Sequence, residues 1–214
     1  MSTSDNRRVV GLILAGGQSR RMGGGDKGLL QLGGRSMLAH VIARLALQAG
    51  PLVLNANGDP ARFAELGLPV VADTIEGFVG PLGGVLAGLR WAAAHAPAAT
   101  HVVSVSADAP FLPHDLVVRL AAAVADRPTS IALARSGDEI HPVIGLWPVS
   151  LGDDLETELK AGVRKVLRWT GKHGTVPVDF PFIAAGDACI DPFFNANTPD
   201  ELDEARRLLA LLPS

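Results

Sequence analysis

A glycine-rich segment with basic side chains follows the first apolar run of the chain. The apolar run is Val9–Leu14, and the segment after it ends at Lys27 and also contains Arg20 and Arg21. Glycines let backbone N–H groups turn toward an anion and let a ligand approach closely. Arginine and lysine supply the positive charge that phosphate oxygens attract. The segment therefore predicts a nucleoside triphosphate site at the carboxyl end of the first strand of an α/β sheet.

Two better-known phosphate-binding loops do not fit this segment. A Walker A loop needs Gly-Lys-Ser/Thr, whereas Lys27 follows Asp26 and precedes Gly28, so no hydroxyl is placed to hold magnesium. A Gly-x-Gly-x-x-Gly spacing occurs at Gly23, Gly25 and Gly28, but the dinucleotide fingerprint must begin in the tight turn directly after the strand. The alternative without a ligand is a solvated surface loop, which would need no strand leading into it.

Polar side chains stand where later apolar runs end. Asn55 and Asn57, then Asp73, then Asp108 each follow such a run. Ligands of open α/β sheets bind outside the carboxyl ends of the strands, so these side chains are expected near the glycine-rich segment. Each of them alone could equally be a turn former. Magnesium prefers carboxylate and phosphate oxygens, and one protein carboxylate suffices when a triphosphate supplies the rest, so Asp108 is the candidate for Mg²⁺.

A third polar group lies near the end of the chain. Asn195 and Asn197 are two positions apart, and alternate residues of an extended segment face the same side. The two amides can therefore point toward one ligand. A helix-capping loop is an equal alternative, because Thr198 followed by Pro199 would explain the segment without a ligand.

The elements that must position these residues alternate between strand and helix patterns, which predicts a mostly parallel sheet with helices on both faces. The run of Leu29, Leu30 and Leu32 after Lys27 is helix-forming and anchors the glycine-rich segment. Strands are expected at residues 9–14, 51–55, 70–73, 101–105, 130–134, 143–148 and 175–180. Helices are expected at residues 37–49, 60–66, 83–95, 112–125, 151–169 and 199–212.

Composition narrows the class of protein. The chain has 214 residues, 48% hydrophobic and 19% charged, which predicts a globular protein with one domain, residues 9–214, after a polar and disordered tail, residues 1–8. A net charge of −3 argues against a nucleic-acid partner. No apolar run is long enough for a membrane span or a signal peptide. The single cysteine, Cys189, fits a reducing cytoplasm.

The glycine-rich segment carries a specific resemblance. Leu-Ala-Gly-Gly-x-x-x-Arg-Met-Gly-Gly-x-Asp-Lys, from Leu14 to Lys27, resembles the signature of the molybdenum cofactor guanylyltransferases. The strand ending at Asp108, the Asp73 segment with its Gly-Pro-Leu-Gly-Gly turn, and the Asn-x-Asn-Thr-Pro segment resemble further blocks of that family, so the resemblance covers nearly the whole chain. It implies a three-layer α/β/α, Rossmann-like nucleotidyltransferase of the nucleotide-diphospho-sugar transferase type.

The resemblance also implies an activity. GMP would pass from GTP to molybdenum-molybdopterin, giving molybdopterin guanine dinucleotide and pyrophosphate, with Mg²⁺ as cofactor. The attacking group is an anionic phosphate, so catalysis should rest on positioning and charge neutralisation. Further partners would be molybdopterin-handling proteins or molybdoenzyme chaperones. The implied residues are Leu14, Ala15, Gly16, Gly17, Lys27, Asn55, Asp73 and Asp108 for GTP; Lys27, Asp108 and Arg21 for catalysis; Asp108 for the metal; and Asn195 and Asn197 for the pterin.

Rival functions stay open at the level of sequence. A CTP-dependent molybdopterin cytidylyltransferase would tend to have Leu-Ala-Ala-Gly where this chain has Leu-Ala-Gly-Gly, and Asp26 before Lys27 also favours the guanylyl branch. A sugar-phosphate nucleotidyltransferase is a second rival. A non-catalytic GTP-binding escort of molybdoenzymes belongs to another class, and it could dispense with the carboxylate of Asp108.

Overall fold

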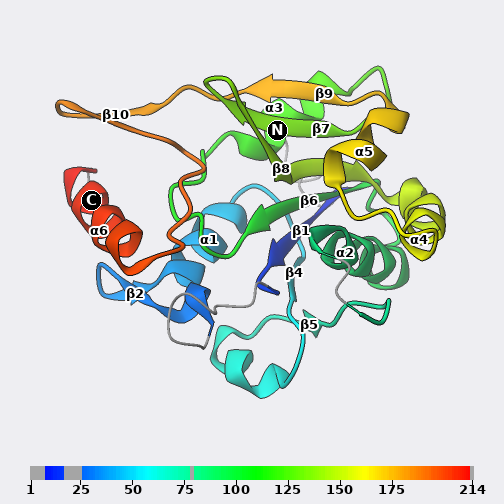
Figure 1. The fold of residues 1–214 in the computed structure, drawn as a ribbon, viewed down its shortest axis with the longest axis horizontal. Helices are drawn as coiled ribbons and strands as arrows, with labels where there is room; N and C mark the ends of the chain where they lie inside the picture. Colours follow the sequence, from blue (N-terminus) through cyan, green and yellow to red (C-terminus); the bar gives the residue numbers. More distant parts are fainter. Residues whose placement is uncertain (1–7, 17–25, 78–79, 213–214) are drawn as a thin grey trace.

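A seven-stranded sheet forms the centre of the molecule, with strand order β5-β4-β1-β6-β8-β7-β9 (Figure 1). The structure is a computed structural model, and it describes residues 8–16, 26–77 and 80–212. β8 is antiparallel to β6 and β7, whereas the other neighbouring pairs are parallel, so the predicted mostly parallel sheet is confirmed. The strands are β1 Val9–Leu14, β4 Leu52–Asn55, β5 Val70–Val71, β6 His101–Ser106, β7 Ala132–Ser136, β8 Glu139–Pro148 and β9 Val176–Asp179.

Helices cover both faces of this sheet, because successive side chains of a strand point to opposite faces. Ile13 of β1 packs in one apolar cluster with α1 and α3, whereas Leu12 packs in a second cluster with α2, α4 and α5. α2 approaches β1 closely at Gly88, where a Cβ would lie 2.5 Å from a methyl carbon of Leu12. The predicted three layers are therefore confirmed. The helices are α1 Met37–Leu45, α2 Pro81–His95, α3 Leu116–Ala123, α4 Gly152–Lys160 and α5 Val166–Thr170.

A third apolar cluster lies beside the sheet and involves the last helix, α6 (Pro199–Leu211). Figure 1 shows α6 next to β2 and away from α2 and α4. The cluster joins Leu202 and Leu208 of α6 to Leu32 and Ile190, which come from two small hairpins. It therefore holds the chain before α6 against the carboxyl-end edge of the sheet. The hairpins are β2 Gln31–Leu32 with β3 Arg35–Ser36, and β10 Ile183–Ala185 with β11 Ala188–Ile190.

One local expectation was wrong. The run after Lys27 forms one 3-10 turn, η3 (Lys27–Leu29), and then the β2–β3 hairpin, because Gly33 and Gly34 adopt φ of 58° and 85° and turn the chain back. Residues 151–169 are mostly helical, as predicted, with an interruption between α4 and α5, where Gly162 has a φ of 91°.

Of the predicted N-terminal tail, Arg8 is described and residues 1–7 lie outside the described part of the chain. The carbonyl of Arg8 accepts a hydrogen bond of 2.9 Å from the amide of Thr100, just before β6. Within the described ranges no helix combines the length and apolarity that crossing a membrane requires.

Candidate active site

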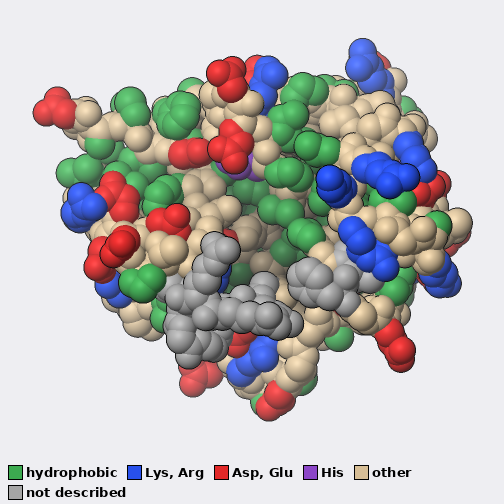
Figure 2. Space-filling model, viewed as in Figure 1, with side chains coloured by type: hydrophobic (Ala, Val, Ile, Leu, Met, Phe, Trp, Pro, Cys, Tyr) green, Lys and Arg blue, Asp and Glu red, His purple; other side chains and the backbone are tan. Residues whose placement is uncertain are grey.

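Three parallel strands end side by side at one edge of the sheet. β1 lies between β4 and β6, and Leu14 is in register with Asn55 on one side and with Ser106 on the other. Side chains that follow these strands therefore collect at this edge, as the sequence predicts. Figure 2 shows that the surface is hollowed near the centre of the same view, between acidic side chains over α6 and basic side chains over α4 and α5.

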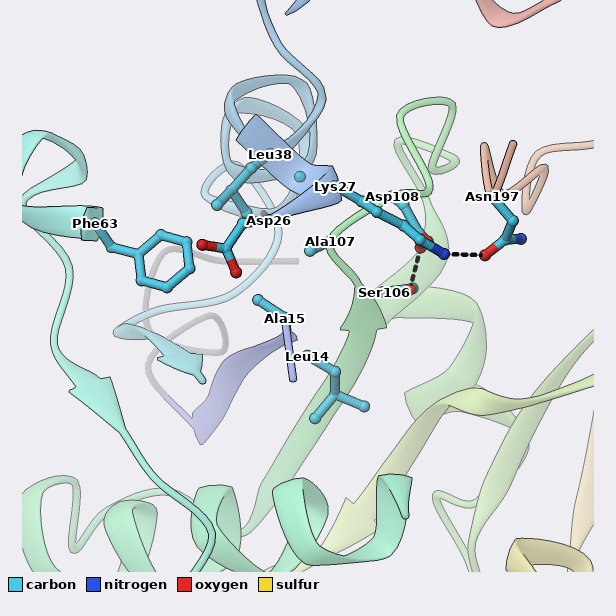
Figure 3. Close-up of a pocket in the computed structure, with 11 residues that line it drawn as sticks. Leu14, Ala15, Asp26, Lys27, Leu38, Phe63, Ser106, Ala107, Asp108 and Asn197 are labelled. Carbon is cyan, nitrogen blue, oxygen red and sulfur yellow. Dashed lines mark hydrogen bonds between the residues drawn. The ribbon is translucent and has the colours of Figure 1, made fainter. Parts of the chain in front are cut away.

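A pocket at this edge brings together the blocks that the sequence singled out (Figure 3). Lys27, Asp108 and Asn197 all line it, although they come from the start, the middle and the end of the chain. Gly17 and Arg21, two further predicted site residues, lie outside the described residues. The full lining is Leu14, Ala15, Asp26, Lys27, Gly28, Leu38, Phe63, Ser106, Ala107, Asp108 and Asn197.

Asp108 stands just beyond β6, where a buried strand fixes its backbone. The hydroxyl of Ser106 donates a hydrogen bond to its carboxylate, and its carbonyl accepts one of 3.3 Å from the amide of Ala196. No group of three or more His, Cys, Asp or Glu side chains in the described part of the chain could hold a metal ion. Mg²⁺ is commonly held by one or two protein carboxylates together with phosphate oxygens and water, and Asp108 could supply such a carboxylate.

Lys27 reaches across the pocket to the C-terminal segment. Its Nζ donates a hydrogen bond of 2.8 Å to Oδ1 of Asn197 (Figure 3). Asn197 is held in turn by the start of α6, because its backbone N–H donates a hydrogen bond of 2.6 Å to the Glu201 carboxylate. Thr198 caps that helix as predicted, with its hydroxyl accepting from the Glu201 amide at 3.2 Å. The start of α6 thus fixes the position of Asn197, to which Lys27 is hydrogen-bonded.

Asn195 does not join Asn197 in the pocket lining. Its Oδ1 is buried and has no hydrogen-bond partner within the described chain. Its carbonyl accepts a bond of 3.4 Å from Nδ2 of Asn197, so the two residues are in contact even though their side chains are placed differently. A buried amide oxygen without a donor is costly, so this position is an exception among buried polar groups of the described chain.

A second polar group lies beside the pocket and is built on Asp73. Nδ2 of Asn55 donates to one carboxylate oxygen at 3.0 Å, and Nδ2 of Asn57 donates to the other at 2.9 Å. The amide of Asp73 donates back to Oδ1 of Asn57 at 2.9 Å. The carboxylate is therefore held from both sides. The sequence places Asn57 after the strand but assigns it no role, and its contact with Asp73 is visible only in three dimensions.

Glycines bring the backbone close to this polar group. At Gly84, near the start of α2, a Cβ would lie 2.3 Å from Oδ1 of Asn55 and 2.6 Å from a methyl carbon of Leu14, so a larger residue would displace them. At Gly16 a Cβ would lie 3.6 Å from Oδ1 of Asn55, which is ordinary contact. Gly16 therefore faces the Asn55–Asp73 group across space that a methyl group would partly fill.

The sequence did not identify two other polar residues at the site, Arg62 and Ser106. Arg62 pairs with Asp26 at 2.9 Å and lies in a short 3-10 helix that carries no motif. His141 is buried against the ring of Phe193 and hydrogen-bonds the Ser136 hydroxyl at 2.7 Å. Burial lowers the pKa of His141, and its ring packs as a core side chain.

The chain matches known proteins over nearly all of its length. A family described as the MobA-like NTP transferase domain matches residues 11–178. A molybdenum cofactor guanylyltransferase of Bradyrhizobium sp. (strain ORS 278) is 56% identical, over 99% of this chain and 98% of that protein. A second one, from Rhodopseudomonas palustris (strain BisB5), is 53% identical over 97% of each chain.

Solved structures share the fold at much lower identity. Molybdopterin-guanine dinucleotide biosynthesis protein A from Archaeoglobus fulgidus has a TM-score of 0.72 at 22% identity, covering 95% of this chain and 100% of that one. A protein from Mycobacterium tuberculosis, in complex with manganese, has a TM-score of 0.64 at 18% identity, covering 94% and 98%. These likenesses, with the sequence matches, confirm the expected nucleotidyltransferase fold and the resemblance. The chain therefore belongs to the molybdenum cofactor guanylyltransferases, within the family of MobA-like NTP transferases.

Proposed function

We propose that this chain transfers GMP from GTP to molybdenum-molybdopterin and releases pyrophosphate. The observation that carries the proposal is the meeting of Lys27, Asp108 and Asn197 in one pocket beside the Asp73 group. Lys27 supplies a positive charge, Asp108 a carboxylate that could hold a metal ion, and Asn197 an amide that donates and accepts hydrogen bonds. A reaction between a triphosphate and a phosphate-bearing pterin requires such groups. The names of the relatives support the same reaction.

The guanosine end of GTP is assigned to the Asp73 group. The guanine edge offers two neighbouring N–H donors, and a carboxylate can accept both. Asn55 and Asn57 hold the Asp73 carboxylate in place. The backbone of Leu14, Ala15, Gly16 and Gly17 would line the nucleotide, which the lack of side chains at the two glycines permits.

The phosphate end is assigned to Lys27, Arg21 and Asp108. Asp108 would hold Mg²⁺, whose charge would stabilise the leaving pyrophosphate; a solved relative of the same fold binds manganese. Lys27 would neutralise charge on the phosphates, with help from Arg21. Because the attacking phosphate is already an anion, no side chain needs to remove a proton.

The pterin is assigned to Asn195 and Asn197. Asn197 offers its remaining Nδ2 hydrogen next to Lys27, and Asn195 has a buried oxygen without a donor in the described part of the chain. We place the protein in the cytoplasm, in line with its single, free cysteine. Molybdopterin-handling proteins or molybdoenzyme chaperones would be its protein partners.

Pyrophosphate release tests the reaction. We expect release from GTP, dependent on molybdenum-loaded molybdopterin and on magnesium, and much weaker release from CTP or ATP. Release mainly from CTP would identify the molybdopterin cytidylyltransferase, and release that requires a sugar phosphate would identify the sugar-phosphate nucleotidyltransferase. GTP binding without any turnover would favour the non-catalytic GTP-binding escort of molybdoenzymes.

Gly16→Ala tests the place of the nucleotide. In the free protein the new methyl group meets Asn55 at ordinary contact distance, so the fold should be unchanged. If the nucleotide occupies this space, GTP use should fall about tenfold while CTP use falls less, since the larger base is crowded more. The ratio of kcat/KM for GTP and CTP is the measurement. The parent ratio in the variant would show that Gly16 does not face the base.

Asn195→Ala and Asn197→Ala test the pterin side. Each should raise the KM for the pterin about tenfold, since each removes a hydrogen-bonding amide, while GTP affinity changes less than threefold. Separate titrations with GTP and with the pterin measure the two effects. A loss confined to GTP affinity would mean that the two ligands have been assigned the wrong way round.

A further inference from the structure

Arg62 bridges two parts of the site that are remote in sequence from each other. Its Nε lies 2.9 Å from a carboxylate oxygen of Asp26, and its Nη2 donates to the carbonyl of Asn57 at 2.6 Å. Asp26 directly precedes Lys27, while the side chain of Asn57 holds the Asp73 carboxylate. One guanidinium therefore connects the backbone of Asn57, whose side chain holds Asp73, with the residue that directly precedes Lys27.

The local fold is built to place this side chain. The short helix η4 (Pro60–Leu66) is capped by Asp59, whose carboxylate accepts from the amide of Ala61 at 2.9 Å. Phe63 anchors the helix in the core at 1% exposure and lines the pocket. Gly58 has a φ of 88° and makes the turn into the helix, and a Cβ there would lie 3.3 Å from Arg62 Nη1. The turn leaves the guanidinium free to reach back over Asn57.

Arg62 is held by a largely buried carboxylate and by an aromatic ring. The Arg62 side chain is 35% exposed, whereas that of its partner Asp26 is 17% exposed. The guanidinium also lies 4.9 Å above the ring of Phe63, which limits its movement. Figure 3 shows the Asp26 carboxylate on the Phe63 side of the pocket, with Lys27 extending the other way toward Asn197. The ion pair thus holds Asp26, the residue directly before Lys27, in place.

We propose that Arg62 is a positioning residue that holds Lys27 at a fixed distance from the bound base. The proposal rests on the proposed function, which assigns Asp73 to the base and Lys27 to the phosphates. Arg62 links Asp26, the residue before Lys27, to the turn at Asn57, whose side chain holds Asp73. These two parts of the site therefore move as one unit. Without Arg62, the base contacts persist but Lys27 is no longer held at a fixed distance from them. Small misplacements of a catalytic group cost large factors in rate.

Arg62→Ala should therefore lower kcat about tenfold while the KM for GTP changes less than threefold. Arg62→Lys should not restore kcat, because a single ammonium group cannot span the Asp26 carboxylate and the Asn57 carbonyl as the planar guanidinium does. The matched control is Arg90→Ala. Arg90 is 39% exposed and bridges Asp153 and Glu156 between α2 and α4, away from the pocket, so this variant should keep the parent kcat. Thermal melting of all three variants monitors the fold.

A double-mutant cycle gives the decisive comparison. If Arg62 acts through Asp26, then Asp26→Asn combined with Arg62→Ala should be no slower than the slower single variant. Parent kcat in Arg62→Ala, full rescue by Arg62→Lys, or additive losses in the double variant would each overturn the proposal. Parent rates in both Lys27→Ala and Asp73→Asn would instead reject the assignment of the base and the phosphates to these residues. Absence of GTP-dependent pyrophosphate release by the parent protein would reject the proposed function itself, so the failures are distinguishable.

Discussion

Asp108→Asn should lower turnover about a hundredfold or more while GTP affinity changes little. A hundredfold corresponds to about 2.7 kcal/mol of transition-state stabilisation, a typical loss when a metal-centred charge contribution is removed. The fold should survive, because asparagine has the same shape and can still accept the Ser106 hydroxyl. The carbonyl of residue 108 also keeps its bond to Ala196. Initial rates of pyrophosphate release and a GTP titration measure the two quantities.

Magnesium dependence identifies the cause of that loss. If the variant binds the cation more weakly, raising the magnesium concentration should recover part of the rate. Asp73→Asn is the control, since it keeps Asp108 and should alter GTP affinity with a smaller effect on magnesium dependence. Near-normal turnover of Asp108→Asn with the parent's magnesium requirement would overturn the proposed mechanism even if GTP is the substrate.

Lys27→Ala should weaken GTP binding and slow transfer by about ten- to a hundredfold, as expected when a hydrogen bond from a charged group is lost. The structure adds a second effect. Asn197 loses the donor that orients its amide, so the KM for the pterin should also rise. A loop lysine contributes little to the core, and the melting temperature should change by no more than a few degrees. Steady-state kinetics with each substrate varied in turn separates the two effects.

Two further variants control for charge and for general surface effects. Lys27→Arg keeps the positive charge and should retain more activity than Lys27→Ala. Lys172→Ala removes an exposed lysine that pairs with Glu158 far from the pocket, and it should behave as the parent. Unchanged GTP affinity and rate in Lys27→Ala would remove the basis for placing the phosphates at this lysine.

The sheet edge could be predicted because its strands are mainly apolar. β1 and β4 end where the sequence indicates and β6 ends one residue later, at Ser106, and the rule that parallel strands share a carboxyl edge then places Asn55 and Asp108 at the same edge. The β2–β3 and β10–β11 hairpins escaped prediction because strands of two or three residues carry too little pattern.

Contacts between distant residues were the other part that sequence could not supply. The position of Arg62 depends on the fold of the turn that carries it, and its partner Asp26 is far away in the chain. Alternation predicts that Asn195 and Asn197 face one ligand, but of the two only Asn197 lines the pocket. Glu201 of α6 holds the backbone of Asn197, and Lys27 holds its side chain. Alternation predicts a shared side of the chain, not a shared cavity.

The contact between Lys27 and Asn197 joins residues 170 positions apart. On the ribosome, Asn55 and Asp108 are made well before Asn197 appears, and chains generally fold from the N-terminal side during synthesis. Under the proposed assignment, the residues for the nucleotide are therefore synthesised before those for the acceptor. Transfer would then require the finished chain, because the acceptor side of the site is added last.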